Sequence, residues 1–467
     1  MNKPLKGNQA IVIGSSMAGL ITARVLADHF RQVILLEKDE TDDEPKPRKG
    51  VPQGHHLHGL LAQGRTLLET FYPGLGDELI ADGAITGDMG ESMRWYHFGG
   101  YKKKFSSGLK GLLMSRPLLE IHVRRRTVQL PNVTLRMGCQ VRELMTDVTG
   151  QRVTGVRLET LGQEVIRRES LEADLIVDAS GRGSASLRWL TALGYHKPPE
   201  EEVKIGLSYA TRLYRREVDP LGQVELIMVA PEPPHDKRGC FAFPIEDNRW
   251  IVTMSGILHE SCPKDPDAFL DFTKSLCAPD IYELLQTSEP LSDIVLYKFP
   301  CSLRRHYEQL KAFPDRYLVV GDAVCSFNPI FGQGMTSAVL QAQTLDRCLQ
   351  NSKTLDGLWK PYFKAIAKVV DSPWQAATGE DFRYPEAEGQ RPPGFELLNR
   401  YTEAVHRATQ RDTVVYKAFL EVMNLMRPPQ SLMRPTIFWR VMKDKMLHQR
   451  QSKNRREGIA ETVSAPA

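Results

Sequence analysis

Apolar positions along the chain fall into short continuous runs separated by stretches with helical spacing. Gln9 to Ile13 and Val33 to Leu36 have the length of buried strands, and the apolar positions from Ala18 to Ala27 between them recur with a helical period. Similar runs occur at Asp174 to Asp178 and at Tyr317 to Val320. Continuous apolar strands that alternate with helices are typical of a parallel sheet covered by helices, so we predict such a sheet here.

A different pattern begins after Lys204. Short stretches that alternate between apolar and polar residues, punctuated by Pro and Gly, predict a mixed β-sheet inserted between the third and the final strand of the parallel sheet. The expected strands are Gly206 to Tyr214, Val224 to Val229, Gly239 to Pro244 and Arg249 to Ser255.

Beyond Val320 the patterns are mostly helical. We expect an irregular segment from Ser372 to Pro385, and helices at Gln341 to Gln350, Leu358 to Val370, Leu397 to Met426 and Pro435 to Met446. The chain therefore divides into four parts. These are a discontinuous α/β domain (1–190 with 300–352), a β-sheet domain (191–299), a helical region (353–442) and a basic tail (443–467) expected to be solvated and partly disordered.

Composition narrows the class of protein. The chain has 467 residues and a net charge of +4, which is too small and too dispersed to indicate nucleic-acid binding. No apolar run approaches the roughly 18–20 residues of a membrane span, and the first strand begins too early to leave room for a signal peptide. The seven Cys residues have no C-x-x-C spacing, which argues against a metal site or a disulfide framework. We expect a reduced, cytoplasmic location.

The first strand leads into a glycine turn that opens a helix. Gly14 provides the tight turn and Gly19 lets the helix pack close to the strand, while Ser16 stands where such turns usually have a middle glycine. Free amide groups at the start of this helix can hold phosphates. Glu37 ends the second strand 23 residues after Gly14, near the ~20-residue spacing of a carboxylate that binds ribose hydroxyls.

A second strand–glycine–helix turn lies near the other end of the chain. The strand ending at Val320 leads into Gly321-Asp322, then a loop containing Pro329, and then Gly332-x-Gly334 opens a helix. Two such turns in one chain predict one long cofactor laid across both helix N-termini, and FAD fits this arrangement best.

Two further segments carry candidate cofactor ligands. The polar loop from Arg48 to Gly59 contains His55, His56 and His58, but no fourth metal donor lies at ligand spacing, so we expect no metal. We interpret it as a loop beside the flavin, with Arg48 directed toward phosphates or ribityl oxygens, and an ordinary solvated loop is the alternative. Arg116 follows the helix cap Ser115 and would point at a ligand or at a surface carboxylate.

These motifs together resemble those of the single-component flavin monooxygenases of the aromatic hydroxylase group. The closer resemblance is to the squalene-epoxidase-like branch that includes bacterial polyether epoxidases. The residues that carry it are Gly14 to Gly19 with Glu37, Val51 to His58, Asp178-Ala179-Ser180-Gly181-Arg182-Gly183-Ser184, Gly321-Asp322 through Gly334, and Pro373-Trp374-x-x-Ala377-Thr378-Gly379-x-Asp381. The resemblance spans nearly the whole chain and implies an FAD-binding Rossmann-like domain of the glutathione-reductase type, with an inserted mixed β-sheet substrate domain and a helical C-terminal region.

The resemblance also implies roles for individual residues. Glu37 would bind the adenosine ribose, Val141 the adenine through its backbone, and Asp322 a ribityl hydroxyl. Arg116 would face the pyrophosphate or the ribityl chain, and the amides after Gly332 and Gly334 would face the pyrimidine end of the flavin. The full set expected around the cofactor is Gly14, Ser16, Met17, Ala18, Gly19, Glu37, Lys38, Arg48, Arg116, Val141, Asp322, Gly332, Gly334 and Met335.

Two departures from the family pattern bear on the reaction. Aromatic hydroxylases have Asp-Gly where this chain has Ser180-Gly181, a motif that also serves the nicotinamide cofactor, so NAD(P)H would deliver electrons either directly or through a separate flavin reductase. The tryptophan-rich motif of flavin halogenases is absent, because its place reads Gly239 to Pro244.

The leading hypothesis is an FAD monooxygenase that epoxidises or hydroxylates a hydrophobic small molecule with O2 through a flavin C4a-hydroperoxide. We name no catalytic side chain, because such an oxygen transfer depends on placement and water exclusion. Phe241, Phe243 and Trp250 are expected to form the substrate wall, with Trp374 in a lid, and ordinary core is the alternative for each. The alternatives in function are a reductase or dehydrogenase of an isoprenoid-like double bond and a redox-inactive ligand-binding protein. Contact of the C-terminal helices with a membrane surface is a minority interpretation.

Overall fold

A five-stranded parallel sheet forms the first layer of the protein. The computed structural model describes residues 4–160, 167–217 and 225–447. The strand order is β18 (Tyr317–Val319), β10 (Leu175–Asp178), β1 (Gly7–Ile13), β2 (Phe30–Leu36) and β6 (Val133–Arg136). Each of the four apolar runs predicted to be buried strands is found in this sheet, with β1 at its centre between β10 and β2.

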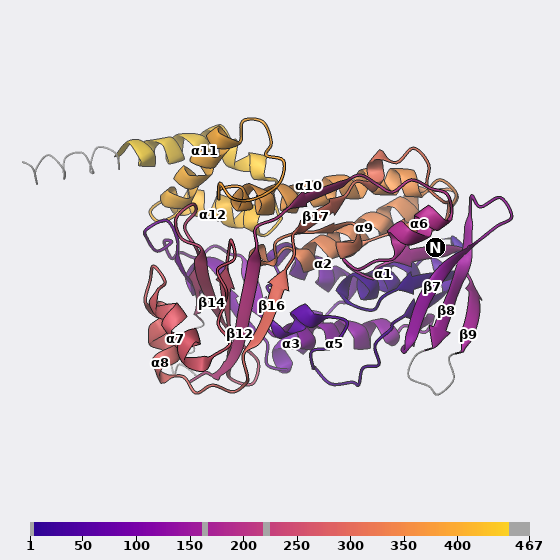
Figure 1. The fold of residues 1–467 in the computed structure, drawn as a ribbon, viewed down its shortest axis with the longest axis horizontal. Helices are drawn as coiled ribbons and strands as arrows, with labels where there is room; N and C mark the ends of the chain where they lie inside the picture. Colours follow the sequence, from indigo (N-terminus) through magenta and orange to yellow (C-terminus); the bar gives the residue numbers. More distant parts are fainter. Residues whose placement is uncertain (1–3, 161–166, 218–224, 448–467) are drawn as a thin grey trace, which may run out of the picture.

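Helices α1 (Met17–Ala27) and α5 (Arg116–Val128) pack against this sheet and against each other. Helix α9 (Gly334–Asn351) packs on α1, and α2 (Ala62–Phe71) packs on α9. The predicted cap of α5 is confirmed, because the Ser115 hydroxyl accepts a hydrogen bond from the Leu118 amide at 3.2 Å. A three-stranded antiparallel sheet, β7 (Cys139–Thr146), β8 (Val153–Thr160) and β9 (Arg168–Glu172), forms one end of the molecule (Figure 1).

The expected mixed sheet is present at the other end of the molecule (Figure 1). Its order is β16 (Val295–Phe299), β12 (Leu207–Arg215), β15 (Arg249–Gly256), β14 (Arg238–Ile245), β13 (Leu226–Val229) and β4 (Met93–Tyr96). All pairs are antiparallel except β13–β4, which is parallel. The edge strand β4 lies more than a hundred residues before β13 in the chain. Of the predicted Val224 to Val229 strand, Val224 lies outside the described residues.

The mixed sheet has two different faces. Helices α7 (Pro266–Lys274) and α8 (Asp280–Thr287) cover one of them in a cluster that includes Cys240, Ala242 and Trp250. The other face carries Phe241 and Phe243 and is turned toward the C-terminal helices. Successive side chains of a strand point to opposite faces, which explains this division.

Helices form the C-terminal region, as predicted. They are α10 (Trp359–Asp381), α11 (Phe395–Ala408), α12 (Thr413–Met423) and a further helical stretch over residues 435–447. The single helical run expected from Leu397 to Met426 is broken at Asp412, whose carboxylate caps α12 by accepting from Val414 N at 2.8 Å. Within the described residues, no helix is both long and apolar enough to cross a membrane. Of the basic tail, residues 448–467 lie outside the described residues.

The prediction of an irregular segment from Ser372 to Pro385 is wrong over its first two-thirds. Helix α10 continues through Pro373 to Asp381. Proline removes one backbone hydrogen bond from the helix, but Pro373, Trp374 and Ala377 are all buried, and this burial holds the helix together across the break.

The remaining elements are short. They are α3 (Leu75–Ala81), β3 (Ile85–Asp88), α4 (Met89–Ser92), β5 (Lys110–Leu113), α6 (Ser186–Ala192), β11 (Glu200–Val203), β17 (Ser302–Arg305) and β19 (Cys325–Ser326). Strands β3 and β5 pair with each other, and β17 lies between β11 and β19.

Candidate cofactor and substrate site

The two glycine turns meet in space. Gly14 has φ +97°, and a Cβ placed on Gly19 would lie 1.7 Å from the Gly14 carbonyl oxygen, so α1 approaches its turn as closely as only glycine allows. Gly321 has φ +71°, and a Cβ placed there would lie 2.8 Å from the Cβ of Ala18. The start of α1 is therefore in contact with the turn that follows β18.

Both helices begin without a side-chain cap. Ser16 precedes α1 and Gln333 precedes α9, and neither side chain bonds to the first amides of its helix. The first turns contain no acidic residue, and Gly334 is exposed. The positive ends of two helices with free N–H groups thus lie close to the touching turns, which suits an anionic ligand.

Glu37 lies at the end of β2, beside the first turn. Its carboxylate accepts hydrogen bonds from the Ser15 amide at 2.9 Å, the Ser15 hydroxyl at 2.8 Å and the Asp39 amide at 3.0 Å, and pairs with Arg48 at 3.1 Å. Burial alone would raise the pKa of Glu37, but Arg48 and these hydrogen bonds lower it below its usual value. Glu37 is therefore ionised and held in one orientation.

Two arginines converge on the start of α1. Arg48 pairs with Glu120 at 2.8 Å and Asp39 at 3.1 Å, and Arg116 pairs with Glu120 at 2.7 Å and donates to the Ser16 hydroxyl at 2.9 Å. Arg48 Nη2 and Arg116 Nη1 are buried and have no hydrogen-bond partner within the described part of the chain. These two free donors beside an open helix N-terminus fit an anionic group such as a pyrophosphate.

The other expected cofactor residues lie around the same turns. Asp322 is exposed to solvent, yet desolvation by the protein around its carboxylate raises its pKa, against the opposing effect of Arg182 and Arg116. Val141 lies in β7, whose Cys139 amide bonds to the Glu37 carbonyl at 2.8 Å. Met17, Ala18 and Gly19 form the first turn of α1, Gly332 and Met335 flank the start of α9, and Lys38 follows Glu37.

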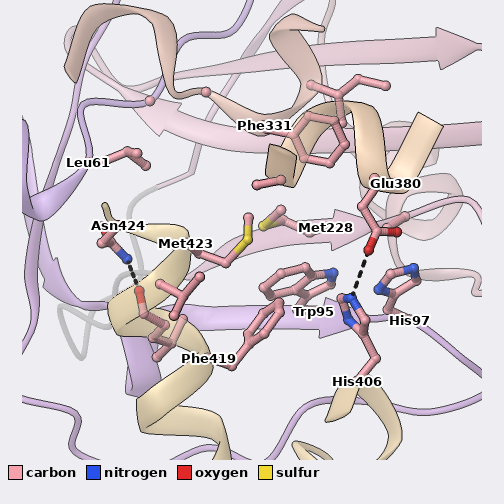
Figure 2. Close-up of a pocket in the computed structure, with 18 of the residues that line it drawn as sticks. Leu61, Trp95, His97, Met228, Phe331, Glu380, His406, Phe419, Met423 and Asn424 are labelled. Atoms are coloured by element: carbon pink, nitrogen blue, oxygen red, sulfur yellow. Dashed lines mark hydrogen bonds and ion pairs between the residues drawn. The ribbon is translucent and has the colours of Figure 1, made fainter. Parts of the chain in front are cut away.

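A largely apolar cavity of about 470 Å³ lies next to this site. It is bounded by the mixed sheet, the loop Asn328 to Gly332, the end of α10, and helices α11 and α12. Its apolar walls include Leu57, Leu60, Leu61, Met93, Trp95, Leu226, Met228, Phe241, Phe243, Ile330, Phe331, Val405, Phe419, Leu420 and Met423. Figure 2 shows Phe331 on one side of this space and Trp95, Phe419 and His406 on another.

Comparison with known proteins identifies the family. The sequence matches the family described as FAD binding domain over residues 8–354. The chain belongs to this FAD-binding family. It is 34% identical over 444 residues to protein Rv3254 of Mycobacterium tuberculosis, covering 90% of each chain. It is 25% identical over 360 residues to kynurenine 3-monooxygenase of Salinispora tropica, covering 73% of this chain and 72% of that protein.

A solved structure shows the same fold. The flavoprotein/dehydrogenase from Cytophaga hutchinsonii has a TM-score of 0.67 and 16% sequence identity, and the match covers 96% of this chain and 100% of that chain. The predicted fold class, an FAD-binding Rossmann-like domain with an inserted mixed sheet and a helical C-terminal region, is therefore confirmed.

The residues at the two turns fit FAD. The close approach at Gly19 leaves the α1 amides unobstructed, and the two free arginine donors and the ionised Glu37 lie along the side of the same turn. A dinucleotide needs donors for its phosphates and an acceptor for its ribose, and this set supplies both.

Two of the four aromatic residues expected at the substrate wall do line the cavity of this FAD-binding protein. Phe241 and Phe243 face it from β14. Trp250 does not, because it pairs across the sheet with Pro244 and so lies on the face covered by α7 and α8. Trp374 does not line the cavity either, because it points from α10 into the main hydrophobic core.

The histidine loop packs against the mixed sheet. His56 Nδ1 lies 2.7 Å from the Thr211 hydroxyl, and His58 Nδ1 lies 2.9 Å from the His56 carbonyl. Burial lowers the pKa of both His56 and His58 to about 4, so both rings are neutral at pH 7. Residues 4–160, 167–217 and 225–447 contain no group of three or more side chains arranged to hold a metal ion.

Most of the polar residues in the cavity were not predicted from the sequence, apart from Asp381, which belongs to the Pro373 to Asp381 motif. Trp95 and His97 come from β4 and the residue after it, while Glu380 and Asp381 come from the last turn of α10 and His406 from α11. Asp381 is 2% exposed, and its carboxylate accepts a hydrogen bond from Asn328 Nδ2 at 2.7 Å. The alternation of Met93 and Trp95 was the available signal for β4, but nothing in it shows that this strand joins β13.

Proposed function

We propose that this FAD-binding protein is a monooxygenase that inserts one oxygen atom from O2 into a hydrophobic small molecule. The main support is the position of the loop Asn328 to Gly332. This loop follows the second glycine turn and also forms a wall of the apolar cavity. A substrate in the cavity would lie directly against the part of the cofactor site that the Gly332 and Gly334 amides face. The relationship to kynurenine 3-monooxygenase supports the same reaction class.

The proposed cofactor contacts follow the geometry described above. Glu37 would hold the adenosine ribose, Arg48, Arg116 and the α1 amides the pyrophosphate, and Asp322 a ribityl hydroxyl. Lys38 and Val141 would border the adenine. Bound FAD, once reduced, would supply the electrons that activate O2.

The residues of the chain would position the substrate and exclude water. Phe241, Phe243 and Phe331 supply apolar walls on the sheet and loop sides, and Phe419 and Met423 do so from α12. Exclusion of water protects a reactive oxygen species from decomposition, and a confined substrate reacts at one position rather than several. Asp381 lies in this wall and can hold a proton near neutral pH, because burial raises its pKa to about 7 despite the Asn328 hydrogen bond.

The finer parts of the proposal concern the branch and the electron source. Epoxidation of an alkene, as in the squalene-epoxidase-like and polyether epoxidase branch, is supported by the Pro373 to Asp381 motif and by the large apolar cavity. NAD(P)H is the proposed electron source, directly or through a separate flavin reductase, and O2 and a hydrophobic substrate are the other partners.

The test is turnover of the purified yellow protein with NAD(P)H and isotope-labelled O2, with and without an added flavin reductase, across a panel of aromatic and polyene compounds. The proposal expects a product that carries one labelled oxygen atom. Products that carry oxygen from water, or consumption of O2 with no oxygenated product from any compound, would contradict it.

A second candidate is reduction of an isoprenoid-like double bond. Asp381 favours it, because a carboxyl with a pKa of about 7 beside the loop Asn328 to Gly332 could protonate a carbon during hydride addition. Anaerobic incubation with reduced protein distinguishes the two functions. A saturated product formed without O2 supports the reductase, and a strict requirement for O2 supports the monooxygenase.

A further inference from the structure

The cavity has a polar end in an otherwise apolar wall. It is formed by Trp95, His97, Glu380, Arg383 and His406, which we call the polar end. Figure 2 shows Glu380, His97 and His406 gathered at one side, with the indole nitrogen of Trp95 at the end of its ring nearest them. The region toward Leu61 and Met423 is mostly apolar, with Asn424 beside Leu61. A cavity with this division suits a molecule with one polar group and a long apolar body.

Four buried side-chain atoms of the polar end lack hydrogen-bond partners among the described residues, namely Trp95 Nε1, His97 Nδ1, and Nε and Nη1 of Arg383. Trp95 and His97 are each 6% exposed, and their rings are stacked with centroids 6.2 Å apart. Trp95 Nε1 and His97 Nδ1 are buried and have no hydrogen-bond partner among the described residues. Buried polar atoms are normally paired, so unpaired atoms on neighbouring rings of a cavity wall point to a ligand.

The two atoms have opposite hydrogen-bonding roles. An indole N–H can only donate. The Pro231 backbone lies near the His97 ring, and a neutral ring that carries its N–H on Nε2 has Nδ1 as an acceptor. Burial, and then His406, Lys102 and Arg383, hold the pKa of His97 well below its usual value, so the ring stays neutral. The pair therefore offers one donor and one acceptor side by side.

The charges of the polar end are already balanced. Burial would raise the pKa of Glu380, but Arg383 and His406 lower it to about 2, so Glu380 is ionised opposite the Arg383 guanidinium. Lys102 lies behind the wall, 5.3 Å from the Trp95 ring centroid, and donates to the His406 carbonyl at 2.9 Å. Burial holds the pKa of Lys102 well below its usual value. Arg383 has two buried donors without a hydrogen-bond partner among the described residues, but its charge already balances that of Glu380, 3.5 Å away. A substrate carboxylate would add a second anion opposite this one guanidinium, so a neutral polar group fits better.

We propose that the polar end binds a hydroxyl group, alcoholic or phenolic, of an otherwise apolar substrate. Trp95 Nε1 donates a hydrogen bond to the hydroxyl oxygen, and His97 Nδ1 accepts a hydrogen bond from the O–H. A hydroxyl is both donor and acceptor and so satisfies both atoms at once. The inference rests on the proposed function in taking this cavity as the substrate site. It places the hydroxyl near β4 and the apolar body toward Phe331, so the position that receives oxygen is remote from the hydroxyl.

Three probes with one body and different head groups test this assignment. They are 4-phenylphenol, biphenyl and biphenyl-4-carboxylate, titrated into the purified FAD-loaded protein by calorimetry. The expected order is 4-phenylphenol tightest, by about threefold to tenfold over biphenyl, which is the range of one neutral hydrogen bond. A carboxylate that binds tightest, equal affinity for the three probes, or no binding of 4-phenylphenol up to its solubility would overturn the proposal.

Variants identify the atoms responsible. Trp95→Phe keeps a ring and removes the N–H, and His97→Phe keeps a ring and removes the acceptor. Each should reduce the preference for 4-phenylphenol over biphenyl to less than about twofold. The control Met423→Leu changes the apolar wall and should leave the preference intact. A preference unchanged in both ring variants would overturn the proposal.

The calorimetric titrations measure binding without turnover, so they test the hydroxyl site independently of the proposed monooxygenase function. Preference for the phenol without any labelled product would support the hydroxyl site and contradict the proposed monooxygenase function. Labelled product without the preference would support the monooxygenase function and contradict the hydroxyl site.

Discussion

Asn328 donates its side-chain amide to the carboxylate of Asp381 at 2.7 Å, and this bond joins the loop after the second glycine turn to the last turn of α10. The other carboxylate oxygen, Asp381 Oδ2, has no hydrogen-bond partner within the described ranges. Burial is the main reason that the pKa of Asp381 rises to about 7, although the Asn328 bond opposes the rise. A titrating group thus lies in the wall between the FAD site and the cavity.

The first prediction concerns stability and pH. The folded-state pKa of Asp381, about 7, lies above the ordinary value of 3.8, so the folded protein holds this proton more tightly than the unfolded chain. Its contribution to stability is complete below the lower value and is lost as the pH rises to the higher one. Urea unfolding from pH 4 to pH 8 should therefore show the parent losing up to a few kcal/mol relative to Asp381→Asn. Parallel curves for parent and variant would show that Asp381 is ionised throughout.

The second prediction concerns the first glycine turn. Gly19→Ala would place a methyl group 1.7 Å from the Gly14 carbonyl oxygen, so α1 must move away from the strand. We expect loss of bound FAD and a marked fall in the unfolding temperature, measured by flavin absorbance and thermal denaturation. The control Gly183→Ala meets no atom within 4 Å and should retain both.

The third prediction concerns cofactor retention. Asp322→Ala would remove the proposed acceptor of a ribityl hydroxyl, and a hydrogen bond to a charged group contributes about 1.5–3 kcal/mol, or roughly tenfold to a hundredfold in affinity. FAD dissociation followed by flavin fluorescence measures the loss. The exposed Asp77→Asn serves as control. Equal FAD affinity in parent and Asp322→Ala would remove Asp322 from the cofactor site.

The fourth prediction separates core from cavity wall. Trp374 is 4% exposed in the main core, so Trp374→Ala should lower the free energy of unfolding by about 3–5 kcal/mol. The affinity of the Trp374→Ala protein for an apolar probe such as biphenyl should stay close to that of the parent. Phe243→Ala is expected to do the opposite, with a smaller effect on stability and weaker probe binding, because Phe243 lines the cavity. Weaker probe binding in Trp374→Ala, with parental binding in Phe243→Ala, would show that Trp374 and not Phe243 contacts the probe.

The sequence predicted well what depends on local spacing. The Ser115 cap, the strand that ends at Glu37 and the two glycine turns all involve residues close together in the chain, where periodicity and turn chemistry are informative. These features were enough to predict FAD and the fold, and the family match confirms both.

What could not be predicted depends on pairing between distant segments. Trp250 faces α7 and α8 only because of the register of β14 against β15. Pro373 suggested a break in the helix, but burial of its neighbours carries α10 through it. Trp95 and His97 enter the cavity because β4 pairs with β13, a contact that no local pattern shows.

A single turnover of the pre-reduced protein tests the central claim most directly. The FAD-loaded protein is reduced without NAD(P)H, freed of reductant, and mixed with isotope-labelled O2 and a compound that turns over in the panel. We predict one labelled oxygen atom in the product and close to one product per bound FAD. Hydrogen peroxide with no labelled product, or product whose new oxygen comes from water, would contradict the assignment as a monooxygenase.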